Sequence, residues 1–207
     1  MRPQPIVSVL LSVWLVSACH QTAGHVSNPR VPPPNATLPA ARNHIDGTRY
    51  TDEELGITAD VPAGWIKTLN RSEFSLIVAP SPTSSGVFGR LKLSIGHQDM
   101  ISHLDIGFRT LFAFVAVTPA FDGPTLDSEQ KTSAFERDAH ERVWHFAASS
   151  SHLKIVLVPE CPNREPSPNS SSLMFFATVW SDPWDEKALN SWIASFREKS
   201  RFPYCGN

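Results

Sequence analysis

Hydrophobic and polar residues alternate along several short stretches of this chain. In residues 55–61, the side chains of Leu55, Ile57, Ala59 and Val61 fall on one face of a strand, followed by a Pro-Ala-Gly turn and Trp65. The same kind of pattern predicts strands over residues 74–79, 91–95, 125–135, 142–148, 152–158 and 173–180. We expect the last three to form an antiparallel meander, and the polar residues 81–89 to form a hairpin tip.

Two segments show helical spacing instead. Apolar residues recur every three or four positions between residues 99 and 117, where Asp99 can cap the first turn. Near the end of the chain, Leu189, Trp192, Ile193 and Phe196 form one apolar stripe. Asp182 and Pro183 suit the N-cap and the first position of this second helix.

The start of the chain has the pattern of an export signal. Arg2 precedes an apolar run over residues 6–16, which ends in Val-Ser-Ala-Cys at residues 16–19. This run is shorter than the ~20 residues of a membrane-spanning helix, and the cysteine resembles the lipobox of bacterial lipoproteins. We therefore expect residues 1–18 to be a signal peptide, and Cys19 to carry the lipid, palmitate included, that anchors the exported protein to a membrane of the cell envelope.

Residues 19–48 are rich in Pro, Asn, Ala and Thr, and show no sustained hydrophobic period. Proline-rich segments favour extended conformations, so we expect a disordered tether here, followed by one globular domain over residues 49–207. His20 follows Cys19, where inner-membrane lipoproteins of bacteria with two membranes resemble each other in having Asp. In such a bacterium this favours the outer membrane.

Charge and cysteine content limit the kinds of molecule that this chain is expected to bind and the covalent links it is expected to form. The formal net charge is −2, and Lys and Arg are dispersed, so nucleic acid is not an expected partner. With Cys19 assigned to lipid, Cys161 and Cys205 remain, and an exported protein with two such cysteines invites a disulfide between them.

Two short motifs resemble the PsbP-like family. Residues 55–65, which end in Pro-Ala-Gly-Trp, look like that family's first strand, and residues 192–196 are similar to its final-helix signature. The order of strands, helix and meander between them also agrees. The resemblance implies an α+β fold, an α/β/α sandwich in which helices flank a central antiparallel sheet. It implies members that bind or help to assemble other proteins, and it transfers no catalytic residue to this chain.

Known catalytic and metal-binding motifs are missing from the sequence. His140 and His145 are five residues apart, whereas a zinc protease helix needs a spacing of four, and in a strand they would point to opposite faces. His97 and His103 could meet His145 or His152 only through the fold. No Gly-x-Ser-x-Gly elbow or phosphate-binding glycine loop is present. We expect no cofactor, no metal site and no enzymatic activity.

The leading hypothesis is thus a lipid-anchored, non-enzymatic domain that binds or helps to assemble another envelope protein. Exposed aromatic residues would mark the contact surface, with Trp180, Trp184, Phe121 and the 81–89 loop as candidates. The alternative is a small-ligand binder with an apolar cleft between the sheet and the long helix, lined by Phe108, Phe112 and Phe114. A hydrolase whose Ser and His converge only in the fold is a third possibility.

Overall fold

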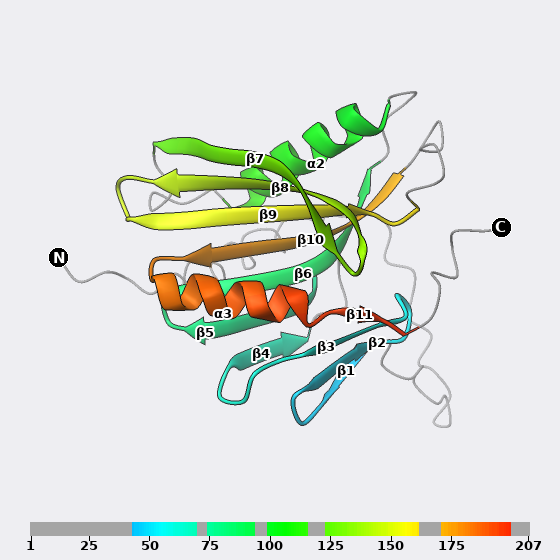
Figure 1. The fold of residues 1–207 in the computed structure, drawn as a ribbon. Helices are drawn as coiled ribbons and strands as arrows, with labels where there is room; N and C mark the ends of the chain where they lie inside the picture. The colour runs from blue at the N-terminus through cyan, green and yellow to red at the C-terminus, as the bar shows by residue number, and fades with distance from the viewer. Residues whose placement is uncertain (1–42, 70–73, 94–98, 116–122, 162–170, 200–207) are drawn as a thin grey trace, which may run out of the picture.

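The computed structural model describes residues 43–69, 74–93, 99–115, 123–161 and 171–199 (Figure 1). The elements of the larger sheet are β4 (Ile66–Leu69), β5 (Phe74–Ser81), β6 (Ser84–Leu93), β7 (Pro124–Ala134), β8 (Arg137–Phe146), β9 (Ser151–Pro159) and β10 (Ser171–Trp180). The smaller sheet contains β1 (Asn43–Asp46), β2 (Arg49–Asp52), β3 (Ile57–Asp60) and β11 (Arg197–Glu198). The described helices are α2 (Met100–Val115) and α3 (Pro183–Ala194).

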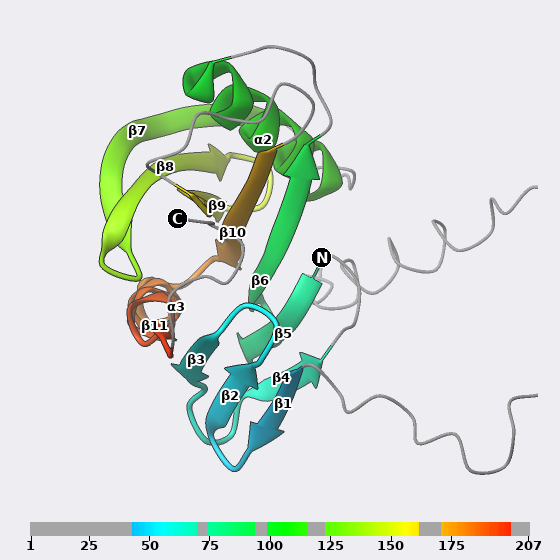
Figure 2. The same ribbon diagram turned by 90° about the vertical axis from the view of Figure 1, so that its right-hand side faces the viewer.

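All strand pairs are antiparallel, in the orders β4-β5-β6-β10-β9-β8-β7 and β1-β2-β3-β11. Helix α2 covers one face of the seven-stranded sheet, while α3 and the four-stranded sheet lie on the other (Figure 2). Successive side chains of β9 contribute to the cores on both faces of the sheet. Ile155 and Leu157 face α2, whereas Val156 and Val158 face α3 and the small sheet.

The predicted α+β fold with a central antiparallel sheet is therefore correct. The predicted α/β/α sandwich needs correction, because the described residues place one short helix on the second face, and a small sheet covers the rest of that face. Part of this sheet comes from residues 43–46, which we expected to belong to the tether. The domain therefore begins no later than Asn43, whose side chain also donates to the Ser75 carbonyl.

The predicted hairpin tip at residues 81–89 is also wrong. β5 runs to Ser81 and β6 starts at Ser84, so most of the segment is buried strand. On the face that α3 covers, Ser84 and Gly86 are small because the helix packs directly on them, and the Ser84 hydroxyl donates to the Asp185 carboxylate at 2.6 Å. A Cβ on Gly86 would lie 2.7 Å from the Trp192 ring.

Both predicted helix starts are confirmed. The Asp99 carboxylate accepts a hydrogen bond from the Ser102 amide at 2.8 Å, which lowers the pKa of Asp99. Asp182 accepts from the Trp184 amide at 2.6 Å. The second helix ends at Ala194, before the predicted stripe does.

An aromatic cluster fills the space between the two sheets and α3. The Phe88 ring lies 4.7 Å from Phe196 and 5.3 Å from Phe176, and Trp192 lies 5.2 Å from Phe196, measured between centroids. Phe135, from the turn between β7 and β8, packs 5.5 Å from Phe176. The cluster thus joins the sheets, the last helix and the β7–β8 hairpin, whose Phe135 lies 61 residues before Phe196.

The outer edge of the large sheet is formed by β7, which pairs only with β8. Its pairing is interrupted by a bulge between Leu126 and Ser128. Among its outward side chains are the charged residues Glu129 and Lys131. At the other edge, β4 is short, and the Lys67 ammonium donates to the Gly47 carbonyl at 2.8 Å.

We predict that Gly86→Ala lowers the free energy of unfolding by about 1–3 kcal/mol, because the new methyl group overpacks against a rigid indole. Urea denaturation of the full chain measures this change. Gly107→Ala in α2 is the matched control. Its Cβ meets the flexible tip of Leu173 at 2.9 Å, and alanine favours the helix by about 1 kcal/mol. Equal losses in both variants would contradict the prediction.

A second prediction concerns the buried pair of Tyr50 and Asp52. The Tyr50 hydroxyl donates to the Asp52 carboxylate at 3.1 Å, and burial raises the pKa of Asp52. A raised carboxyl pKa stabilises the fold below the ordinary value of about 3.9, and this contribution is lost as the pH rises through the raised pKa. We expect Asp52→Asn to gain stability relative to the native chain between pH 3 and pH 7.

Chemical denaturation across that pH range measures the difference. The control is Asp138→Asn, which replaces an exposed carboxyl group and should change the pH dependence little. If the difference in unfolding free energy between Asp52→Asn and the native chain stays constant with pH, ionisation of the buried carboxyl group does not destabilise the fold.

Candidate functional site

Only part of the predicted aromatic contact surface is exposed. Trp184 at the start of α3 is 77% exposed, whereas Trp180 is buried in the core. Residues 81–89 are mostly buried strand, and Phe121 lies outside the described residues. Trp184 is therefore the one aromatic candidate that the described residues present to solvent.

Between α2 and the sheet, where we expected an apolar cleft, the described apolar side chains pack against one another. Phe108 is buried, and Phe112 packs 5.0 Å from the Trp144 ring. The Arg142 guanidinium lies 4.4 Å above the Phe108 ring and donates to Asp105 at 3.0 Å, which lowers the pKa of that carboxyl. Phe114 is partly exposed beside Phe74.

The described histidines do not converge as one group. His103 is buried in α2, and neither of its ring nitrogens has a hydrogen-bond partner. His145 and His152 are cross-strand neighbours on the opposite face of the sheet, the face that bears Trp180. His140 lies on the other side of β8 from His145, as the spacing predicts, and His97 is outside the described residues.

Asp127, at the bulge of β7, approaches both cross-strand histidines. One of its oxygens is 2.5 Å from Nδ1 of His145, and the other is 3.9 Å from Nδ1 of His152. No serine hydroxyl hydrogen-bonds to either ring among the described residues. In the same part of the chain, no group of three or more His, Cys, Asp or Glu side chains is arranged to hold a metal.

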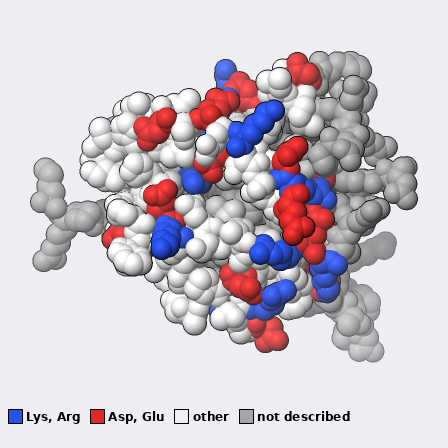
Figure 3. Space-filling view, viewed as in Figure 1, with Lys and Arg blue, Asp and Glu red and all other residues white. Residues whose placement is uncertain are grey.

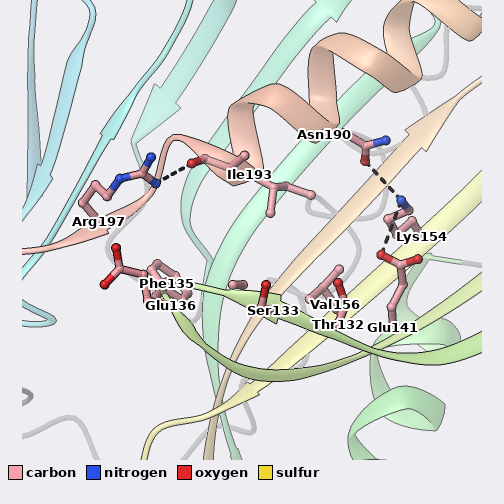
Figure 4. Close-up of a pocket in the computed structure, with 12 residues that line it drawn as sticks. Thr132, Ser133, Phe135, Glu136, Glu141, Lys154, Val156, Asn190, Ile193 and Arg197 are labelled. Atoms are coloured by element: carbon pink, nitrogen blue, oxygen red, sulfur yellow. Dashed lines mark hydrogen bonds and ion pairs between the residues drawn. The ribbon is translucent and has the colours of Figure 1, made fainter.

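The described residues do form a groove on this face, between the C-terminal half of α3 and the β7–β8 hairpin (Figure 4). Its volume is about 380 Å³. We call it the α3 groove, and its lining residues are Thr132, Ser133, Ala134, Phe135, Glu136, Glu141, Lys154, Val156, Asn190, Ile193, Ala194 and Arg197. The sheet curves so that the β7–β8 hairpin approaches α3 (Figure 2), which makes the two facing walls.

One end of the groove is a buried polar network. The Lys154 ammonium lies 3.4 Å from the Glu141 carboxylate and donates to the Asn190 side-chain oxygen at 3.1 Å. The other oxygen of Glu141 accepts from the Gln130 amide at 2.9 Å. Both charged side chains are about nine-tenths buried. Hydrogen bonds around a buried ion pair hold its geometry fixed, so this end of the groove is rigid.

The other end lies beside the turn between β7 and β8. Phe135 and Glu136 have φ angles of 55° and 61°, a left-handed conformation that costs non-glycine residues about 1–2 kcal/mol each. Burial of the Phe135 ring in the aromatic cluster offsets this cost. Arg137 then pairs with Glu198 of β11, so the strained turn is held against the strand that follows α3.

These groove residues were absent from the sequence-based candidates. A signal was present for Lys154, which is a charged residue within the predicted strand 152–158, whereas Glu141 precedes the predicted strand 142–148. The structure places both side chains on the otherwise buried face. A charged residue at an inward position needs a partner or a function. The signals for Arg197 and Glu136 are weaker, since both are exposed and ordinary in sequence.

Charge is mixed across the face that bears the groove. Lys and Arg side chains lie among Asp and Glu side chains without a large patch of one sign (Figure 3). Neither described helix is long and apolar enough to cross a membrane. The apolar run over residues 6–16 and Cys19 lie outside the described residues, as does Cys205. Cys161 follows β9, and its pairing with Cys205 stays a prediction.

No protein-family model matches this chain, and no curated protein is significantly similar to it. Among solved structures, it is similar to the solution structure of cyanobacterial PsbP (CyanoP) from Synechocystis sp. PCC 6803. The two are 15% identical, the match covers 72% of this chain and 91% of that chain, and the TM-score is 0.47. This likeness concerns the fold alone and carries no information about activity.

Proposed function

We propose that this chain is an exported, lipid-anchored protein of the cell envelope whose globular domain binds a ligand in the α3 groove without chemical change. The observation that carries this proposal is a preformed groove whose wall is a strained turn. Strained backbone persists where the surrounding structure holds it, and it clusters at ligand-binding sites. A volume of about 380 Å³ also falls within the range of small-molecule sites.

The chemistry of the groove favours binding over catalysis. Its buried charges, Lys154 and Glu141, are engaged with each other and with Asn190 and Gln130. A general base or a nucleophile needs a free lone pair within reach of its substrate. Among the described residues, the acid–histidine pair Asp127–His145 lacks the bonded serine that a hydrolase of this type requires.

The anchor and the tether complete the proposal. Cys19 would carry the lipid, and the residues between it and β1 would hold the domain away from the membrane. A disulfide between Cys161 and Cys205 would tie the C-terminal segment to the end of β9. A second candidate role, contact with another envelope protein, is supported by the exposed indole of Trp184.

Blocking the groove tests the proposal. Ala194 is exposed and lines the groove, so Ala194→Trp should fill it and leave the core intact. Ser191→Trp, on the same helix but outside the groove, is the matched control. The full chain in detergent is screened by ligand-observed NMR against amino acids, short peptides, sugars and fatty acids.

We expect at least one compound to bind the native chain and the Ser191→Trp chain with equal affinity, and to bind Ala194→Trp at least tenfold more weakly. Two results would overturn the proposal. In one, no compound binds the native chain. In the other, both tryptophan variants retain full binding.

The anchor makes a separate prediction. Cys19→Ala should move the protein from the membrane fraction to the soluble fraction after a carbonate wash, because the lipid attachment is lost. Intact-mass spectrometry of the native protein should show the added acyl chains. Crosslinking in intact cells, with and without this substitution, tests the second role. Equal membrane retention of both forms would rule out the lipid anchor.

A further inference from the structure

The open end of the α3 groove carries two opposite charges on opposite walls. Arg197, just after α3, and Glu136, in the β7–β8 turn, flank this end (Figure 4). Both residues are exposed, and they form no ion pair with each other. Two facing charges with space between them are suited to a molecule that carries the complementary pair.

Arg197 is fixed in place but only partly used. Its Nη1 donates to the carbonyl oxygens of Ala194 and Phe196, the latter at 2.8 Å. These bonds close the C-terminal end of α3 and hold the guanidinium at the groove. The remaining Nε and Nη2 protons have no acceptor among the described residues, and this is the pair of donors that binds a carboxylate in a bidentate manner.

Glu136 is held by its backbone. Its φ of 61° results from the turn, which Phe135 anchors in the aromatic cluster and which Arg137 ties to Glu198. The carboxylate has no hydrogen-bond or ion-pair partner among the described residues. A positioned carboxylate with free acceptor sites suits a ligand ammonium group.

Between these charges and the buried network, the groove is lined by apolar side chains together with the hydroxyl groups of Thr132 and Ser133. Val156 and Ile193 are partly or fully buried and face the groove, next to Ala134 and Phe135. At the far end, Lys154 and Glu141 neutralise each other, so no net charge is left for the ligand to match there. An apolar chain can therefore enter the groove, while its charged groups stay at the open end.

From this arrangement we infer that the ligand of the α3 groove is an α-amino acid with an apolar side chain. Its carboxylate is bound by Arg197, its ammonium group by Glu136, and its side chain lies against Val156 and Ile193. The inference rests on the proposed function, because it assumes that the groove is the binding site. It adds the class of ligand and the two residues that select it.

Three compounds of matched shape test the inference on the full chain by isothermal titration calorimetry. L-Leucine carries both charges, 4-methylpentanoate lacks the ammonium group, and 3-methylbutylamine lacks the carboxylate. Each analogue should bind about tenfold more weakly than leucine, because one charge-assisted contact is lost. Glu136→Gln should lower the affinity for leucine by a similar factor and leave the affinity for 4-methylpentanoate unchanged.

Variants at Arg197 provide the complementary test. Arg197→Gln should lower the affinity for leucine and for 4-methylpentanoate about tenfold, and leave the affinity for 3-methylbutylamine unchanged. Arg197→Lys should show a smaller loss, because it keeps the positive charge. Thermal melting of each variant shows whether the end of α3 stays folded. A similar fall in the affinity of all three compounds would point to a structural effect and would contradict the assigned contacts.

The outcomes separate the two proposals. The ligand class is wrong if leucine fails to bind, or binds no better than both analogues, while Ala194→Trp abolishes the binding of another compound. In that case the groove remains a binding site. If neither leucine nor any screened compound responds to Ala194→Trp, the proposed function itself fails. Leucine binding that is lost in Ala194→Trp and weakened by Glu136→Gln supports both.

Discussion

The aromatic cluster between the two sheets is the interaction on which the rest of this structure depends. Phe88 and Phe176 come from the central strands, Phe196 follows the last helix, and Tyr50 comes from the small sheet. Burial of an aromatic side chain stabilises a fold by about 2–3 kcal/mol, and edge-to-face contacts add to this. The four-stranded sheet packs against this cluster through Tyr50, and its Leu55, Ile57, Ala59 and Val61 are buried in the same core.

The same cluster fixes the groove. Phe135 enters it from a turn that is unfavourable for both of its residues, and its position determines where Glu136 and the end of β7 lie. Trp192 enters it from α3 and rests on Gly86, which sets the height of the helix above the sheet. Both walls of the groove are thus positioned by one packed core rather than by contacts across the groove itself.

Local patterns in the sequence predicted β3, most strands of the large sheet, both helices and their N-caps, because period-2 alternation and capping side chains act within a few residues. Asp182 and Pro183 specify the start of α3 in this way. In the small sheet, β3 was predicted as part of residues 55–61, whereas β1 and β2 were missed because each has only four residues, too short for a period to be visible. The β5–β6 turn was misplaced because small polar residues that serve close packing resemble those of a loop.

The candidate site could be predicted only in part, for a different reason. Lys154 lies in a predicted strand and Glu141 just before another, but their inward position and their pairing depend on the β8–β9 register and on Asn190 of α3. The facing of Arg197 and Glu136 depends on the curvature of the sheet, which no local pattern encodes. Contacts between segments about sixty residues apart are a property of the packed fold.

The exposed edges of the large sheet affect how neighbouring molecules can associate. A seven-stranded sheet that does not close into a barrel leaves backbone donors and acceptors exposed along its outer strands, which invites pairing with a neighbouring molecule. In β7, the bulge near Asp127 and the outward charges of Glu129 and Lys131 interrupt that template. The β7 edge is therefore a poor template for strand pairing between molecules, which disfavours fibre-like association at high protein concentration.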